Sequence, residues 1–174
     1  MSTECRVLVA GIGNIFLGDD GFGPEVLRRV DVGSLPSGVR AVDFGIRGVH
    51  LAYELLDGWD GLVLVDALPN RGAPGAVRVF EIDAGDAARD GGFDAHGMDP
   101  AAVFASLDAL GGTAPRTIVV GAQVRCVDER IGLSAEVAAS LDEAVNAVRR
   151  TVTELVATTP PRAPAATAPP GKEG

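Results

Sequence analysis

The sequence has almost no lysine and few residues that bind nucleic acid. Among its 174 residues the single lysine is Lys172, and Asp plus Glu outnumber Lys plus Arg by 24 to 15, which gives a net charge of −9. Nucleic acids and anionic membranes are bound through clustered basic side chains. The acidic balance therefore excludes both as expected partners.

Cysteine is also scarce. Cys5 and Cys126 are far apart and form no CxxC pair, so neither a disulfide framework nor a zinc-cysteine site is expected. Both are interpreted as small buried apolar side chains. Because 47% of the residues are hydrophobic, a chain of this length can bury a core without such cross-links.

Long hydrophobic runs are missing as well. No apolar run approaches the roughly 20 residues of a membrane helix. The N-terminus lacks the charged region, separate apolar segment and cleavage site of a signal peptide. We expect a monomeric, cytoplasmic protein with one domain over residues 1–159 and a disordered Pro/Ala-rich tail over residues 160–174.

What the sequence does contain is a set of short apolar segments typical of strands. The strongest are 6–12, 61–68 and 116–124, whose uninterrupted apolar runs indicate strands covered on both faces of a parallel sheet. Segments 40–46 and 76–82 are weaker. The connection between 61–68 and 76–82 is too short for a parallel crossover, so we expect the later of these two strands to run antiparallel.

Helices are expected between these strands. Pro24 and Glu25 open the first helix, since proline is tolerated in a first turn, and residues 50–58 form the second. The third is predicted to begin with Asp99 as its N-cap and to end near Gly111.

The last helix has the clearest periodicity. It is predicted to run without interruption from Ser134 as its N-cap. Its apolar residues recur every three or four positions and form one buried stripe of Val137, Leu141, Val145, Val148, Val152 and Leu155. The alternation of strands and helices predicts an α/β fold, with an open twisted, mostly parallel five-stranded sheet, one antiparallel edge strand and helices on both faces.

Ligands of such sheets bind beyond the carboxyl ends of the strands, where the strand order reverses. The first loop, GIGNIFLGDDGFGPEV, begins there like a dinucleotide fingerprint. Its third glycine position is occupied by Phe16, however, and Asp19 and Asp20 would repel a pyrophosphate. We therefore do not expect nucleotide binding, and NAD or ATP should give no thermal stabilisation.

Three polar residues are placed at this edge of the predicted sheet. Asp20 is in the first loop, Asp66 ends the strand LVLVD, and His96 is in the loop after the fourth strand. Two carboxylates and an imidazole suit a divalent metal ion and leave positions open for water or substrate. Taken singly, the aspartates can also be helix or loop caps, and His96 a hydrogen-bonded loop residue. We interpret Asp19 as a solvated or capping neighbour of Asp20.

Four segments also carry a resemblance to a known family. GIGNIFLGDDGFGPEV, LVLVDALP, DAHGMDP and GLSAEVAASLDEAVNAV occur in this order, and together they closely resemble the maturation endopeptidases of [NiFe] hydrogenases, from about Arg6 to Val156. In that family the endopeptidase removes a C-terminal extension from the hydrogenase large-subunit precursor after nickel has been inserted. The resemblance implies that Asp20, Asp66 and His96 are the catalytic, metal-binding residues, and that the nickel comes with the substrate.

The resemblance thus implies a nickel-dependent processing endopeptidase whose partner is a hydrogenase large-subunit precursor. The sequence contains no Ser-His-Asp arrangement, and neither cysteine has an evident histidine partner, so hydrolysis is expected to be metal-assisted. Gln123 stands where many members carry an acidic residue, which puts a carboxylate role there in doubt. The alternative function is a non-catalytic, chaperone-like module that grips the same metal-centred partner.

Overall fold

A five-stranded sheet forms the centre of the molecule, in a computed structural model that describes residues 4–83 and 99–163. The strand order is β2-β1-β3-β5-β4. Neighbouring strands are parallel except for β4, which pairs antiparallel with β5 at one edge. The predicted sheet is confirmed, with strands at β1 (Val7–Ile12), β2 (Val39–Gly45), β3 (Gly61–Leu68), β4 (Val77–Ile82) and β5 (Arg116–Gln123).

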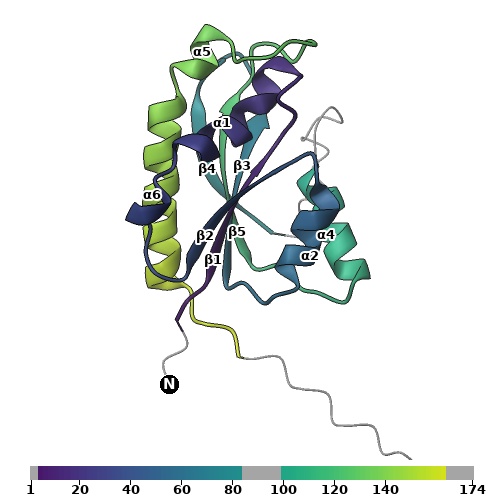
Figure 1. The fold of residues 1–174 in the computed structure, drawn as a ribbon, viewed down its shortest axis with the longest axis vertical. Coiled ribbons are helices and arrows are strands. Elements are labelled where there is room, and N and C mark those ends of the chain that lie inside the picture. Colours follow the sequence, from purple (N-terminus) through teal and green to yellow (C-terminus); the bar gives the residue numbers. More distant parts are fainter. Residues whose placement is uncertain (1–3, 84–98, 164–174) are drawn as a thin grey trace, which may run out of the picture.

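Helices cover both faces of this sheet, as Figure 1 shows: α1 and α6 lie on one face, and α2 and α4 lie on the other. No helix in the described ranges is long and apolar enough to cross a membrane. The helices are α1 (Phe22–Arg29), α2 (Gly48–Leu55), α4 (Pro100–Ala109), α5 (Ala135–Ala138) and α6 (Leu141–Thr158), with short 3-10 turns η1 (Gly18–Gly21) and η2 (Val32–Ser34).

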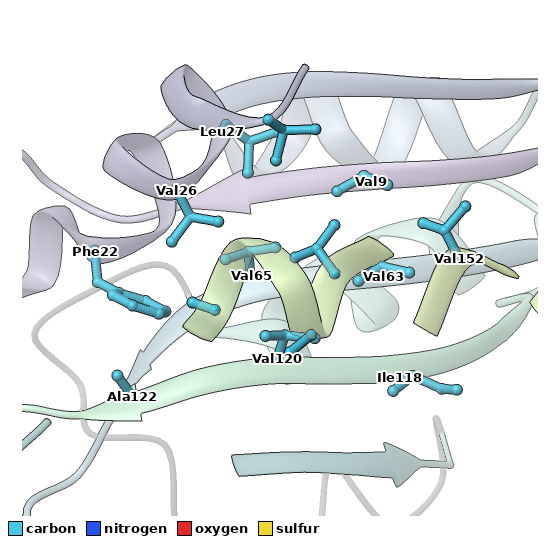
Figure 2. Packing of buried hydrophobic residues seen from close by; sticks show 14 of the residues in the cluster. Val9, Phe22, Val26, Leu27, Val63, Val65, Ile118, Val120, Ala122 and Val152 are labelled. Atoms are coloured by element: carbon cyan, nitrogen blue, oxygen red, sulfur yellow. The ribbon is translucent and has the colours of Figure 1, made fainter. Parts of the chain in front are cut away.

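The two faces of the sheet bury two separate apolar clusters, because successive side chains of a strand point to opposite faces. Val9 of β1 belongs to the cluster under α1 and α6, whereas its neighbours in the strand, Leu8 and Ala10, belong to the cluster under α2 and α4. Figure 2 shows the first cluster, with Val26 of α1 and Val152 of α6 packed over the central strands. Because both faces of the central strands are buried, their sequences are uninterrupted runs of apolar residues.

Two predicted helix starts can be compared directly with the structure. The Asp99 side chain accepts a hydrogen bond from the Ala101 amide at 2.9 Å, and Pro100 is the first helical residue, so the predicted N-cap of α4 is confirmed. Helix α1 begins at Phe22, two residues before the predicted opening at Pro24, which still lies within the first turn, where its missing N–H breaks no helical bond.

The prediction of one uninterrupted last helix was wrong. Ser134 does cap a helix, but that helix is the short α5, and α6 begins separately at Leu141. At the junction the Ser140 hydroxyl and amide both donate to the Val137 carbonyl, at 2.7 and 3.0 Å. A serine that bonds backward in this way competes with the regular helical bond to that carbonyl. Val137 and Leu141 are both buried nevertheless, and Val145 is partly buried.

The two cysteines differ from each other. Cys5 is buried, as predicted, but Cys126 is only half-buried and its thiol lies 2.9 Å from a carboxylate oxygen of Asp128. The interpretation of Cys126 as a buried apolar side chain was therefore wrong, because a polar neighbour satisfies its S–H at the surface.

Candidate active site

The strand order reverses at the boundary between β1 and β3. From β1 the chain passes to β2 on one side, and then crosses back past β1 to β3 on the other side. The carboxyl ends of two diverging strands leave room for a ligand at such a point. Asp20 follows β1 in η1, and Asp66 lies near the carboxyl end of β3. The structure thus places two of the three predicted site residues at the switch point.

Asp66 is buried, with 6% of its surface exposed. Burial raises the pKa of its carboxyl well above the usual value, and the charges of Asp20 and Asp99 raise it further, while a hydrogen bond from the Ala67 amide acts in the opposite direction. A buried carboxyl that faces another negative charge retains its proton to higher pH. Such strongly perturbed groups at a strand-end crevice are typical of functional sites.

Asp20 is buried beside it, with 7% of its surface exposed. One of its carboxylate oxygens, Oδ2, accepts a hydrogen bond from the Asn14 amide at 2.8 Å. Helix α1 has Gly21 at its N-cap position and no side-chain capping bond. The alternative interpretation of Asp20 as the cap of the first helix is therefore wrong, and its carboxylate instead bonds to the loop that follows β1.

Gly13 explains why the first loop begins with the sequence GIG. Its φ is +139°, and a Cβ at this position would lie 2.0 Å from the Asp20 carbonyl oxygen. Only glycine tolerates both the backbone conformation and this approach. The glycine thus lets the main chain of Asp20 pass directly over the end of β1.

Asp19 is neither solvated nor a helix cap, so the interpretation made from the sequence was wrong. Its side chain is fully buried and accepts hydrogen bonds from the amides of Arg125, Cys126 and Ser134 and from the Ser134 hydroxyl. All these donors lie in the loop between β5 and α5. Nothing in the local sequence separates Asp19 from Asp20, because the partners of Asp19 are more than a hundred positions away.

Gln123 has a structural role that the sequence did not reveal. Its side-chain oxygen Oε1 accepts hydrogen bonds from the amides of Arg71 and Ala73, at 2.8 and 3.1 Å. These bonds hold the β3–β4 connection against the end of β5. Neutral glutamine satisfies both donors, so this contact needs no negative charge.

The third predicted site residue, His96, lies outside the described residues. Within residues 4–83 and 99–163, no group of three or more His, Cys, Asp and Glu side chains is placed to hold a metal ion. Asp20 and Asp66 supply two oxygen donors of the kind that divalent metal ions take. A third ligand beside them stays a prediction from the sequence.

The chain is similar to proteins with known names. A relative from Methanocaldococcus jannaschii that carries the name of a hydrogenase maturation protease is 32% identical over 146 residues, which cover 82% of this chain and 93% of that protein. The hydrogenase 2 maturation protease of Escherichia coli is 27% identical over 145 residues, covering 82% of this chain and 88% of that protein.

Solved structures agree with these sequence relatives. The hydrogenase maturating endopeptidase HybD from Escherichia coli superposes with a TM-score of 0.73 and 26% identity, covering 90% of this chain and 98% of that one. The family model described as hydrogenase maturation protease matches residues 25–151. The sequence match, the shared fold and the buried carboxylates at the switch point agree, and the chain belongs to the hydrogenase maturation protease family.

Proposed function

We propose that this protein is the endopeptidase that removes the C-terminal extension of a nickel-loaded [NiFe] hydrogenase large-subunit precursor. The observation that carries the proposal is the buried pair Asp20 and Asp66 at the switch point of the sheet. Family membership supports the proteolytic activity, and the name of HybD from Escherichia coli describes a hydrogenase maturating endopeptidase.

The chemistry of the pair suits a cation that arrives with the substrate. Burial and the charge of Asp20 raise the pKa of Asp66. A second negative charge beside Asp20 is therefore unfavourable unless a cation offsets it. A carboxylate that binds metal must release its proton. The nickel of the precursor would polarise the scissile carbonyl or supply hydroxide, and its positive charge would favour the ionised form of Asp66.

This coupling supports specificity without a deep peptide pocket. A precursor without nickel would bring no cation to the two carboxylates and no Lewis acid to the scissile bond. His96 would add the third contact in this scheme, as the family resemblance implies. The protein would thus act on a folded, loaded partner rather than on peptides in general.

The test is a trimming reaction with purified, nickel-loaded precursor, followed by mass spectrometry of its C-terminus. We expect Asp20→Ala, Asp66→Ala and His96→Ala to trim at least about a hundredfold more slowly than wild type, the usual scale for losing a group that binds or moves protons at the reacting centre. Asp57→Ala is the control, since Asp57 is exposed and follows α2 just before β3 begins, at the opposite edge of the sheet.

Two outcomes would contradict the proposal. Unimpaired trimming by all three site variants would remove these residues from the reaction. A precursor that stays intact in a stable complex with the wild-type protein would favour the alternative, a non-catalytic module that grips the metal-centred partner.

A further inference from the structure

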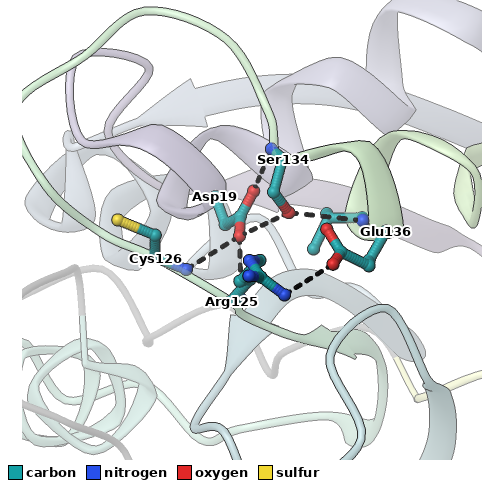
Figure 3. Close-up of polar contacts among 6 residues, drawn as sticks. Asp19, Arg125, Cys126, Ser134 and Glu136 are labelled. Carbon is teal, nitrogen blue, oxygen red and sulfur yellow. Dashed lines mark hydrogen bonds and ion pairs between the residues drawn. The ribbon is translucent and has the colours of Figure 1, made fainter.

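Asp19 joins two loops that are far apart in the sequence. Its Oδ2 accepts hydrogen bonds from the Arg125 amide at 2.8 Å, the Cys126 amide at 3.0 Å and the Ser134 hydroxyl at 2.9 Å, and its Oδ1 accepts one from the Ser134 amide at 2.6 Å. Figure 3 shows this carboxylate at the centre of the β5–α5 loop. Four donors thus converge on one side chain.

All four of these groups donate, so the Asp19 side chain acts only as an acceptor. Hydrogen bonds to a charged acceptor are about twice as strong as neutral ones. A protonated carboxyl or an amide would instead point a hydrogen towards main-chain N–H groups, which cannot accept it.

The main chains of the two loops are bonded as well. The Asp19 amide donates to the Cys126 carbonyl at 3.0 Å, and the Gly18 amide donates to the Arg130 carbonyl at 2.9 Å. The Arg130 amide in turn donates to the Phe16 carbonyl at 3.0 Å. The segments 16–19 and 125–134 therefore form one unit whose side-chain anchor is Asp19.

The next residue in the chain is Asp20, which belongs to the candidate active site. Both aspartates lie in the same 3-10 turn, η1. Asp19 reaches into the β5–α5 loop, whereas the Asp20 carboxylate accepts from the Asn14 amide on the other side of the turn. Because the two residues are joined by one peptide unit, anchoring the backbone of Asp19 in η1 also restricts where the Cα and Cβ atoms of Asp20 can lie.

We propose that Asp19 is a positioning residue, which holds the Asp20 carboxylate at the site by anchoring η1 to the β5–α5 loop. The inference rests on the proposed function for its effect on trimming, but its structural part can be tested separately. Asp19 touches neither Asp66 nor the substrate in this scheme and acts only through Asp20.

The first test uses Asp19→Asn, which keeps the shape of the side chain and replaces one acceptor oxygen with an NH2 group. We expect kcat for trimming of the nickel-loaded precursor to fall about a hundredfold, the loss typical of a reacting group displaced by about 1 Å. KM should change by less than about threefold, since an interaction that matters mainly in the transition state affects kcat.

The second measurement reports on Asp20 without any substrate. In 15N NMR spectra we expect Asp19→Asn to shift the signal of the Asn14 amide, which donates to the Asp20 carboxylate, and to speed the hydrogen exchange of this amide. Asp60→Asn is the matched control. Asp60 is also a buried aspartate that accepts main-chain N–H bonds, from Arg6 and Arg162, but it lies at the start of β3.

A milder pair of variants covers the case in which Asp19→Asn does not fold. Ser134→Ala removes the hydroxyl bond to Asp19 and the N-cap bond of α5 but leaves the three amide bonds to Asp19. We expect a loss in kcat of about tenfold, in line with the loss of one bond to a charged group, and a smaller shift of the Asn14 amide. Ser134→Thr keeps a hydroxyl and should show the wild-type kcat and the wild-type Asn14 amide signal.

The outcomes separate the two proposals. An unchanged Asn14 amide in Asp19→Asn and Ser134→Ala, or equal losses of kcat in Asp19→Asn and Asp60→Asn, would show that Asp19 serves folding alone and would overturn its positioning role. If wild type itself trims no precursor, the proposed function fails, whereas the shift of the Asn14 amide still decides whether Asp19 positions Asp20.

Discussion

Asp20 in η1, which follows β1, and Asp66 near the end of the neighbouring strand β3 are both buried, and the charge of Asp20 acts on the carboxyl of Asp66. Burial, together with the charge of Asp20, raises the pKa of Asp66 well above its usual value. A pair of this kind destabilises the folded protein when both members are ionised. Carboxylates that lower the stability of the fold in this way, at the strand ends of an α/β sheet, are typical of residues kept for function rather than for folding.

Replacing Asp66 with asparagine should therefore stabilise the protein at neutral pH. An aspartate whose pKa is raised in the folded state contributes stability that is fully present below its unfolded pKa, about 3.9, and is lost as pH rises through the folded value. The amide side chain of the variant does not titrate. We expect Asp66→Asn to unfold at a higher temperature than wild type at pH 7 to 8, with the difference shrinking towards pH 4.

Thermal unfolding measured from pH 4 to pH 8 checks this prediction. Asp57→Asn is the control, because Asp57 is exposed and its replacement should shift the unfolding temperature little at any pH. Equal unfolding temperatures for Asp66→Asn and wild type at pH 8 would contradict the raised pKa.

The role of Gln123 can be tested through the stability of the β3–β4 connection. Gln123→Ala leaves the amides of Arg71 and Ala73 without their acceptor. Because both residues are exposed, water can replace the lost partner, and each bond should contribute about 0.5–1.5 kcal/mol. Gln123→Glu keeps an acceptor oxygen at the position of Oε1 and should lose less stability. We expect urea denaturation to rank the stabilities as wild type, then Gln123→Glu, then Gln123→Ala.

Trimming of the nickel-loaded precursor provides the second half of this test. If Gln123 only holds the connection, the folded fraction of both variants should trim at the wild-type rate. A gain or loss of more than about tenfold in kcat for Gln123→Glu, with KM unchanged, would instead place position 123 among the groups that act in the transition state.

Gly23, the single glycine of α1, lies where a side chain would collide with the sheet. A Cβ there would lie 2.3 Å from the Ile12 carbonyl oxygen and 2.4 Å from that of Val65, so α1 would have to move off β1 and β3. We expect Gly23→Ala to lower the free energy of unfolding by about 3 kcal/mol or more, as in severe overpacking.

Gly33→Ala is the matched control for this change. Its Cβ would meet only the Asp31 side chain at 3.4 Å, an ordinary contact, so the free energy of unfolding should change by less than about 0.5 kcal/mol. If chemical denaturation gave similar values for the two variants, the close packing of α1 over the sheet would be refuted.

The architecture was predictable because each strand carries its own signal. β3 and β5 are buried on both faces along nearly their whole length, which produces the uninterrupted apolar runs of a parallel sheet. The short connection before β4 excluded a parallel crossover. The strand-end rule then placed Asp20 and Asp66 at one edge, and the structure confirms that both are buried there.

Features that depend on single side-chain contacts were not predictable. The spacing of Val137 and Leu141 continues a helical stripe, and only the Ser140 bonds to the Val137 carbonyl reveal the break between α5 and α6. Likewise, two adjacent aspartates look alike in the sequence. Which one is buried against a distant loop is decided by Ser134, 115 positions from Asp19.

Two exposed apolar residues lie near the site at which the protein substrate would be cleaved. Phe16 and Ile131 are large apolar side chains with 60% and 76% of their surfaces exposed. Their main-chain segments are adjacent, because the Arg130 amide donates to the Phe16 carbonyl. Phe16 belongs to the turn whose Asn14 amide donates to Asp20. Under the proposed function, this apolar pair would contact the precursor as it docks.

Phe16→Ser should therefore raise KM for the nickel-loaded precursor by about tenfold or more, since burying an aromatic side chain contributes about 1.5–3 kcal/mol and each 1.4 kcal/mol is tenfold in affinity. The kcat and unfolding temperature should stay near wild type, because the side chain is mostly exposed and the main-chain bonds remain. Leu110→Ser is the control, an exposed apolar residue at the end of α4. An unchanged KM for Phe16→Ser, or an equal rise for Leu110→Ser, would mean that the precursor docks without this turn.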